Sequence, residues 1–266
     1  MRKNESKPLT DVNAVDRHFV TSLQKGLDVL TSFGRQHNRL TLSEVARLTG
    51  MSPASARRSL LTLHQLGYLD SDGKRFWVQP RALLVAHAYL SSRPMPSLAQ
   101  PLLDALSERT RESASLGQLL DDEAIIVARS TARRSLSTGL GIGSRLPAYC
   151  SALGRVLLAG MPAQDAMTRV RGMRRVALTP QTVHSVAQVI ELVERCREDG
   201  FSTNDGELEI GVRSMAVPVR DRTGQVVAAI SIAVRVERMG LGEFRDAFLP
   251  MLNRARDTLE RRLFPE

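Results

Sequence analysis

The sequence has few aromatic residues, only two cysteines and no long apolar run. Phe, Tyr and Trp together make up 4% of its 266 residues, whereas hydrophobic residues make up 42%, so we expect a core rich in Leu, Val and Ala. Cys150 and Cys196 lie far apart and without metal-ligand spacing. This arrangement argues against a disulfide scaffold, a zinc site or a redox CxxC motif, and we expect two reduced thiols.

No apolar stretch approaches the roughly 18 residues that a membrane-spanning helix needs, and the polar N-terminus lacks the apolar core of a secretory signal. We therefore expect no membrane partner and a cytoplasmic protein. The sequence contains no HExxH motif and no glycine-rich phosphate loop after a strand, so we expect no metal and no other cofactor. A Ser-His-Asp or Cys-His site assembled from distant residues is left open by the sequence alone. The histidines are scattered: His18, His37, His64, His87 and His184.

The net charge of +9 is concentrated at one end of the chain. Residues 1–93 hold 14 Lys and Arg against 7 Asp and Glu, whereas residues 94–266 hold 23 against 21. A compact basic first third is typical of a protein that binds a polyanion. Nucleic acid fits better than a membrane surface, because no basic segment carries the bulky apolar face of an interfacial helix. A merely basic, soluble surface is the alternative.

Residues 1–18 show no periodicity and are expected to form a flexible tail. A first helix follows, ended by Gly34, with apolar residues at helical spacing. Those residues are Val20, Leu23, Leu27, Leu30 and Phe33.

Two further helices are predicted by their capping residues. Thr41 and Glu44 form a Thr-x-x-Glu capping box, and Gly50 ends that short helix. Ser52 caps the next helix, which ends before Gly67. Only Gly50 and Met51 lie between the first of these helices and the Ser52 cap. The two helices must therefore cross sharply, as in a helix-turn-helix.

The segment "YLDSDGKRFWV" then gives two β-prone runs around Asp72-Gly73, which is a hairpin signal. Three helices and a hairpin predict a winged helix-turn-helix domain over residues 19–79. Residues 80–95 follow as an apolar linker helix, which we expect to pack against its own copy in a dimer, and Pro94 and Pro96 are expected to end it.

Residues 96–266 alternate helical and β-prone segments with hairpin turns, which predicts an α+β domain with an antiparallel sheet flanked by helices. The apolar stripe of the last helix is interpreted as core packing. Helices are expected at 98–111, 151–159, 183–198 and 241–263, and strands near 114–120, 124–129, 136–140, 215–220 and 225–234.

The helix after Ser52 has the properties of a DNA-reading helix. At about 100° per residue, its apolar face centres near Ala56 and Leu60, and Arg58 points about 180° away. Small residues around Arg58 would let the helix enter the major groove, where arginine pairs with guanine, whereas Arg57 on the flank suits a phosphate. A solvated amphipathic helix is the alternative. The predicted DNA contacts are Ser43, Ser52, Ala54, Ser55, Arg57, Arg58, Thr62, Lys74 and Arg75.

A second binding site is suggested by Ser151, which looks like the cap of the helix "ALGRVLLAG". The amides of Ala152 and Leu153 would then point outward at its positive end, where a carboxylate binds readily. An ordinary capped helix is the alternative. Tyr149 could stack on an aromatic acid or be a half-buried core residue.

Three blocks of this sequence resemble the IclR family of bacterial transcription regulators: "LTLSEVARLTGMSPASARRSLLTLHQLGYL", "LPAYCSALGRVLLAG" and "DGELEIGVRSMAVPVRD" with "GQVVAAISIAV". Within the family, "FVTSLQKGLDVL" and "RLPAYCSALGRVLLAG" look most like the group that regulates aromatic-acid breakdown through the β-ketoadipate pathway. The resemblance implies a GAF-like, profilin-like effector domain, a double-stranded DNA partner, a small carboxylic-acid effector, and homodimers that often pair into tetramers.

The resemblance also implies an effector pocket, although Ala233 and Ser214 depart from residues that some members carry there. A family member that responds to a non-aromatic acid, and an enzyme domain tethered to a DNA-binding module, are the alternatives. The sequence does not distinguish activation from repression. The implied pocket residues are Leu140, Tyr149, Cys150, Ser151, Ala152, Leu153, Asp205, Val212, Ser214 and Ser231.

Overall fold

The computed structural model describes residues 18–34, 37–131 and 139–265. The chain divides into two compact units, Met1–Ala88 and Tyr89–Glu266, and the division falls inside the expected linker of residues 80–95.

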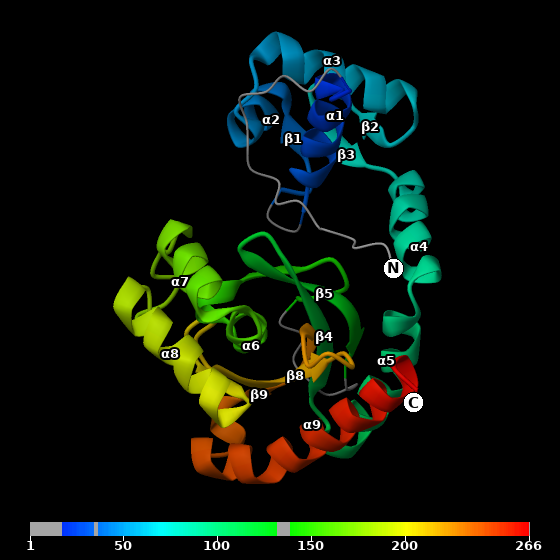
Figure 1. The fold of residues 1–266 in the computed structure, drawn as a ribbon. Coiled ribbons are helices and arrows are strands. Elements are labelled where there is room, and N and C mark those ends of the chain that lie inside the picture. The colour runs from blue at the N-terminus through cyan, green and yellow to red at the C-terminus, as the bar shows by residue number, and fades with distance from the viewer. Residues whose placement is uncertain (1–17, 35–36, 132–138, 266) are drawn as a thin grey trace. The chain divides into compact units, whose positions relative to one another are not determined.

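The first unit contains three helices and a small antiparallel sheet (Figure 1). The Thr41–Glu44 capping box is present, the Ser52 side chain accepts a hydrogen bond from the Ser55 amide, and Gly50 adopts the left-handed conformation at φ 67°. The predicted helices and hairpin are therefore confirmed, with an additional strand, β1, beside the hairpin in the order β1-β3-β2. The elements are α1 (Thr21–Thr31), β1 (Leu40–Thr41), α2 (Leu42–Thr49), α3 (Pro53–Gln65), β2 (Leu69–Ser71) and β3 (Arg75–Val78).

Only part of the apolar stripe predicted for the first helix packs against the core of this unit, through Leu30 and Phe33. Val29 is the buried residue of α1, whereas Leu23 and Leu27 are 62% and 51% exposed. Helical periodicity identified the apolar stripe but could not say which of its residues pack internally.

The linker expected at residues 80–95 contains the end of one helix and the beginning of another. A short 3₁₀ turn, Pro80–Ala82, leads into α4 (Leu83–Ser92), and α5 (Pro94–Thr110) begins almost immediately. The prediction that the linker helix ends at these prolines is confirmed, because α4 stops at Ser92, Arg93 is extended, and Pro94 and Pro96 lie in the first turn of a new helix, α5. Proline is tolerated there since the first amides of a helix have no intrahelical acceptor.

The second unit is built around a six-stranded antiparallel sheet in the order β6-β5-β4-β9-β8-β7. Its strands are β4 (Ser113–Leu120), β5 (Glu123–Ser130), β6 (Arg145–Pro147), β7 (Ser202–Asp205), β8 (Val212–Arg220) and β9 (Val226–Arg235). Its later helices are α6 (Ala152–Ala159), α7 (Ala163–Gly172), α8 (Val186–Asp199) and α9 (Leu241–Leu263), with short 3₁₀ turns at Ala148–Cys150 and Val236–Arg238.

The sheet curls around α6, which packs on its concave face, while α5 and α9 cover the other face (Figure 1). The predicted antiparallel sheet with flanking helices is confirmed. Phe244, Phe248, Leu252 and Leu259 are buried, so the stripe of the last helix is core packing. The sequence did not predict α7, β6 or β7, and most of the strand expected at 136–140 lies outside the described residues.

Within the described ranges, no helix is both long and apolar enough to cross a membrane. The same ranges contain no cluster of three or more His, Cys, Asp or Glu side chains arranged to hold a metal ion.

Candidate functional site

The start of α6 is held by short-range contacts that its sequence dictates. The Ser151 side chain accepts a hydrogen bond from the Gly154 amide at 3.1 Å and donates one to the Pro147 carbonyl at 2.8 Å. The predicted cap is therefore confirmed. Gly154 is required by close packing, because a Cβ atom there would lie 2.2 Å from the Cα atom of Ala148. The turn before α6 is consequently pressed against its first residues.

A buried ion pair fixes this region to the segment before β8. The Arg155 side chain is 2% exposed and donates to both carboxylate oxygens of Glu207, at 2.7 and 2.6 Å. Its Nε atom also donates to the Tyr149 carbonyl. Two parallel charge-assisted hydrogen bonds give this pair a fixed geometry. Neither partner lines the cavities described below, so we assign the pair a positioning role.

The segment after α7 is hydrogen-bonded to Tyr149, just before α6, and to the segment before β8. The Tyr149 hydroxyl donates to the Val176 carbonyl at 2.7 Å and accepts from the Val176 amide at 3.1 Å. Thr179 and Thr182 donate to the backbone carbonyls of Gly206 and Glu207. These bonds hold residues 176–182 and 206–207 together around the beginning of α6.

A small cavity lies between the α6 N-terminus and the sheet. Its volume is about 50 Å³. It is lined by serines, by aliphatic side chains, by one arginine, by one asparagine and by one glutamate: Ser115, Ile126, Arg129, Leu140, Leu146, Ser151, Ala152, Leu153, Asn204, Leu208, Glu209, Val212, Ser214, Ser231 and Ala233. We call this the effector cavity.

Arg129 on β5 is the basic residue among the cavity residues that the sequence did not predict. Its Nη1 atom donates to the Ser115 hydroxyl at 2.6 Å, and burial lowers the pKa of its guanidinium. Arginine presents a planar fork of donors that matches a carboxylate. A signal was present in the sequence, since Arg129 ends an otherwise apolar strand, but strand periodicity alone does not say which face it occupies.

The predicted pocket residues divide into two groups. The structure brings seven of them to the cavity lining: Leu140, Ser151, Ala152, Leu153, Val212, Ser214 and Ser231. Tyr149, Cys150 and Asp205 lie outside it. Asp205 instead pairs with Arg213 through two hydrogen bonds of 3.0 and 2.9 Å.

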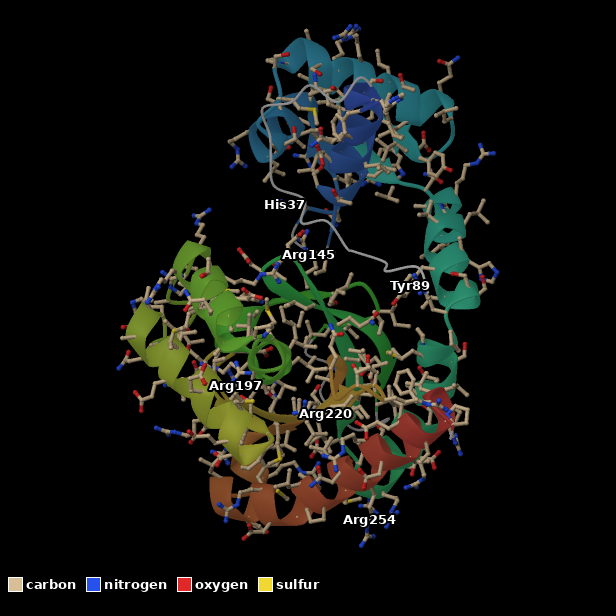
Figure 2. All side chains as sticks on the ribbon, in the orientation of Figure 1. His37, Tyr89, Arg145, Arg197, Arg220 and Arg254 are labelled. Carbon is tan, nitrogen blue, oxygen red and sulfur yellow. The ribbon has the colours of Figure 1, made fainter. Side chains whose placement is uncertain are left out.

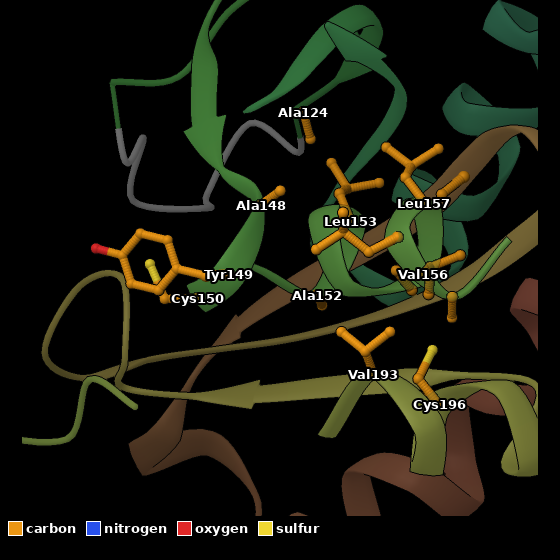
Figure 3. Close-up of a cluster of buried hydrophobic side chains, with 14 of the residues drawn as sticks. Ala124, Ala148, Tyr149, Cys150, Ala152, Leu153, Val156, Leu157, Val193 and Cys196 are labelled. Atoms are coloured by element: carbon orange, nitrogen blue, oxygen red, sulfur yellow. The ribbon is translucent and has the colours of Figure 1, made fainter. Parts of the chain in front are cut away.

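Tyr149 and Cys150 are core residues rather than cavity residues. Tyr149 is 2% exposed and Cys150 fully buried. Figure 3 shows the Tyr149 ring pointing away from Leu153. Burial raises the pKa of the Tyr149 hydroxyl, and it raises the pKa of the Cys150 thiol to about 11. The sequence could not separate these residues from their neighbour Ser151, because the 3₁₀ turn that rotates them away has no clear sequence signal.

A second and much larger hollow lies at the other end of α6, beside Leu157 and Met161. Its volume is about 1150 Å³, and its lining, all within the described residues, includes no Asp, Glu, Lys, Arg or His. Tyr89 borders it and donates to Gln118 at 2.5 Å, while Arg197 donates to the Met161 carbonyl at 2.8 Å (Figure 2). This neutral hollow has the size of a ligand pocket. Its lining includes no basic side chain that could form an ion pair with a carboxylate.

The first unit places most of the predicted DNA contacts at the surface. Ser43, Ser52, Ala54, Arg57, Arg58, Thr62, Lys74 and Arg75 are exposed. Ser55 is 7% exposed and faces the core, so it was wrongly placed on the outer face.

The burial of Ser55 changes the geometry of α3. Its buried residues are Ser55, Ala56, Leu60 and Leu63, and Ser59 beside them is half-buried. At about 100° per residue, the outward direction lies midway between Arg57 and Arg58, about 50° from each. The prediction that Arg58 alone points directly outward was therefore wrong. Arg58 and Thr62 also border a groove of about 650 Å³ shared with Leu23 and Leu27 of α1.

Two family models match the chain. The IclR helix-turn-helix domain matches residues 22–73, and the bacterial transcriptional regulator IclR C-terminal domain matches residues 87–261. This protein belongs to the IclR family. It is a DNA-binding transcriptional regulator with an effector-binding domain, not an enzyme.

Similar proteins agree with this assignment. The Pca regulon regulatory protein of Pseudomonas putida is 38% identical over 250 residues, which cover 94% of this chain and 86% of the relative. A transcriptional regulator from Rhodococcus sp. RHA1 is also 38% identical, with a TM-score of 0.77 over 92% of this chain and 98% of that one.

A third similar protein carries a ligand. It is a double mutant of the inducer-binding domain of the PobR transcription factor from Acinetobacter, in complex with 3-hydroxybenzoic acid. It is 28% identical, with a TM-score of 0.59, and the match covers 62% of this IclR-family chain and 97% of that domain.

Proposed function

We propose that this regulator senses a small aromatic carboxylic acid in the effector cavity. The observation that carries the proposal is the Arg129 guanidinium beside Ser115 on a cavity floor that also contains Ser214 and Ser231. A guanidinium and hydroxyls suit a carboxylate, and the aliphatic side chains above them suit a ring. The complex of the PobR domain with 3-hydroxybenzoic acid supports this ligand class.

The cavity has to enlarge when the acid binds. An engineered cavity of about 150 Å³ accommodates benzene, whereas the effector cavity measures about 50 Å³. Leu140 and Leu208 are only partly buried, so their movement would create space with little loss of packing. A ligand that requires this enlargement favours an open arrangement over a closed one, which is the condition for a change in DNA binding.

The ligand class is tested by calorimetry on the full-length protein. We expect 3-hydroxybenzoate, 4-hydroxybenzoate or protocatechuate to bind, and 4-hydroxybenzamide, which has the same shape without the charge, to bind at least about tenfold more weakly. Cyclohexanecarboxylate and β-ketoadipate test the alternative of a non-aromatic acid. Tighter binding of either one than of every aromatic acid would overturn the aromatic assignment. Equal binding of acid and amide would remove the carboxylate site.

We also propose that the linker comprises residues 80–95, between a DNA-binding domain at 19–79 and an effector domain at 96–266, and that two copies pair through the first unit. Leu23 and Leu27 of α1 are exposed beside an apolar groove that Leu30, Leu66 and Val85 also line. Apolar patches of this kind mark protein interfaces. Sedimentation of wild type and Leu23→Glu tests the pairing, and an unchanged dimer mass in the variant would contradict this interface.

Coupling between ligand and DNA is tested by titrating the effector against binding to the gene's own upstream intergenic DNA. We expect the acid to change the affinity for that duplex. The direction of the change, together with operator position, distinguishes activation from release of repression. An effector that binds the protein but leaves the DNA affinity unchanged would refute the coupling.

A further inference from the structure

The small sheet of the first unit has one face in the core and one face outside it. Leu40 of β1 pairs with Phe76 of β3, and both are buried, at 2% and 9% exposure. Because side chains alternate between the two faces of a strand, Arg75 and Trp77 point to the other side. Thr41, the cross-strand partner of Arg75, shares that outer face.

Arg39 extends this outer face. It directly precedes β1, and its guanidinium carbon lies 4.3 Å from the centroid of the Trp77 ring. Arg39 is exposed, whereas Trp77 is half-buried and anchored in β3. Stacking of a guanidinium on an indole is attractive and restrains an otherwise mobile side chain. Since the guanidinium donors lie in its plane, stacking through its face leaves N–H groups on its edge available to an acceptor.

Two carboxylates near this face, those of Asp72 and Glu44, accept hydrogen bonds from local donors. The Asp72 Oδ1 atom accepts hydrogen bonds from the amides of Lys74 and Arg75 at 2.9 and 2.7 Å, and these bonds lower the pKa of its carboxyl. Glu44 accepts from the amide and hydroxyl of Thr41, both at 2.8 Å, which lowers the pKa of its carboxyl. These acids shape the turn and the helix start, while the basic side chains extend outward.

We propose that Arg39, held by Trp77, is a phosphate-contacting residue that binds the sugar-phosphate backbone of duplex DNA together with Lys74 and Arg75. The proposal rests on the DNA binding of the family and adds a contact outside α3 and outside the hairpin tip. The outer face of the sheet then acts as a backbone clamp. Arg39 carries no sequence information, because every duplex offers the same phosphates.

The test uses full-length protein and a duplex of random sequence, since a phosphate contact is independent of sequence. Affinity is measured at several salt concentrations for wild type and Arg39→Ala. We expect the variant to bind about three- to tenfold more weakly at low salt, and the slope of log affinity against log salt to decrease by about 0.9, the value for one lost phosphate contact. Arg222→Ala is the matched control, because it removes the same charge from an exposed turn of the other unit.

Trp77 supplies a second readout because it is the only tryptophan in the chain. DNA binding at this face should change its emission in wild type, with a smaller change in Arg39→Ala. Arg39→Lys keeps the charge but loses the planar stack, so it should retain the salt slope and only part of the affinity. Thermal melting followed by circular dichroism checks that the variants are folded.

The possible failures are distinguishable. If wild type binds no duplex, the DNA-binding function fails and this proposal fails with it. If wild type binds while Arg39→Ala matches it in affinity and salt slope, only the role of Arg39 is overturned. A loss of affinity equal to that of Arg222→Ala would also overturn it, because the effect would then be one of net charge.

Discussion

Two arginines of the effector domain lie in contrasting surroundings. Arg155, at 1% exposure, is bonded through both terminal nitrogens to Glu207 in a sealed region at the start of α6. Arg129 lines the effector cavity on the other side of that helix start and donates to the neutral hydroxyl of Ser115. One guanidinium is positioned to hold loops together, and we propose that the other meets the ligand.

The contrast shows that burial alone does not identify a binding residue. Arg155 is the more deeply buried of the two, but its donors are directed to Glu207 and to backbone carbonyls rather than into a cavity. Cavity volume is equally misleading, because the larger hollow is neutral while the small one contains the arginine. The chemistry that faces the space decides between them.

The largest expected effect follows from Arg155→Met. Removing the guanidinium leaves the Glu207 carboxylate buried without its partner, which costs about 3–5 kcal/mol of the free energy of unfolding. Denaturant unfolding measures the loss. A decrease below about 1 kcal/mol would mean that water already reaches Glu207 and that the region is not sealed.

The matched control for this prediction is Arg155→Met combined with Glu207→Leu. Replacing both ends of a buried ion pair by apolar side chains is often nearly neutral, so the double variant should recover most of the lost stability. Failure to recover would show that the hydrogen bonds from Arg155 to the Tyr149 and Thr203 carbonyls, rather than the ion pair, carry the stabilisation.

Arg129→Met should have the opposite profile. We expect acid affinity to fall by about 100-fold, equivalent to about 2.8 kcal/mol, with a change in unfolding free energy under about 1 kcal/mol. Calorimetry and denaturant unfolding give the two numbers. Arg145→Met is the control, because Arg145 begins the neighbouring strand β6, pairs with Glu123 and lies outside the cavity lining (Figure 2). Equal losses of affinity in the two variants would contradict the role of Arg129.

The sequence predicts features that depend on neighbouring residues better than features that depend on residues far apart in the chain. Local signals succeeded: the Thr41–Glu44 box and the Ser52 and Ser151 caps all appear as predicted. Each needs only hydrogen bonds within one helical turn. The apolar strands of the sheet were also predictable, because continuous hydrophobic runs bounded by turns are typical of buried strands.

Tertiary placement was not predictable in the same way. Ser55 is small and polar and looked like a residue of the outer face, but contact with α1 buries it. Tyr149 looked like a ring for stacking, yet its hydroxyl bonds to a loop 27 residues later in the chain. Arg129 depends on which face of β5 meets α6. Each answer requires a partner distant in sequence, which periodicity does not contain.

The last expected effect is a pH dependence that comes from the two thiols that pack in the sealed region. Burial raises the pKa of Cys150 from its ordinary value of 9.0 to about 11, and that of Cys196 to about 12. Because the unfolded chain can ionise both thiols at lower pH than the folded one, their contribution is intact below pH 9 and is lost as pH rises toward 11 and 12. Each thiol should steepen the fall of stability above pH 9 by at most about 1.4 kcal/mol per pH unit.

Denaturant unfolding from pH 8 to 10.5 on wild type and on the double variant Cys150→Ala with Cys196→Ala isolates this slope. A variant that follows the wild-type slope would mean that the thiols ionise without unfolding, and hence that the region around Arg155 is as open to water as the cavity beside Arg129.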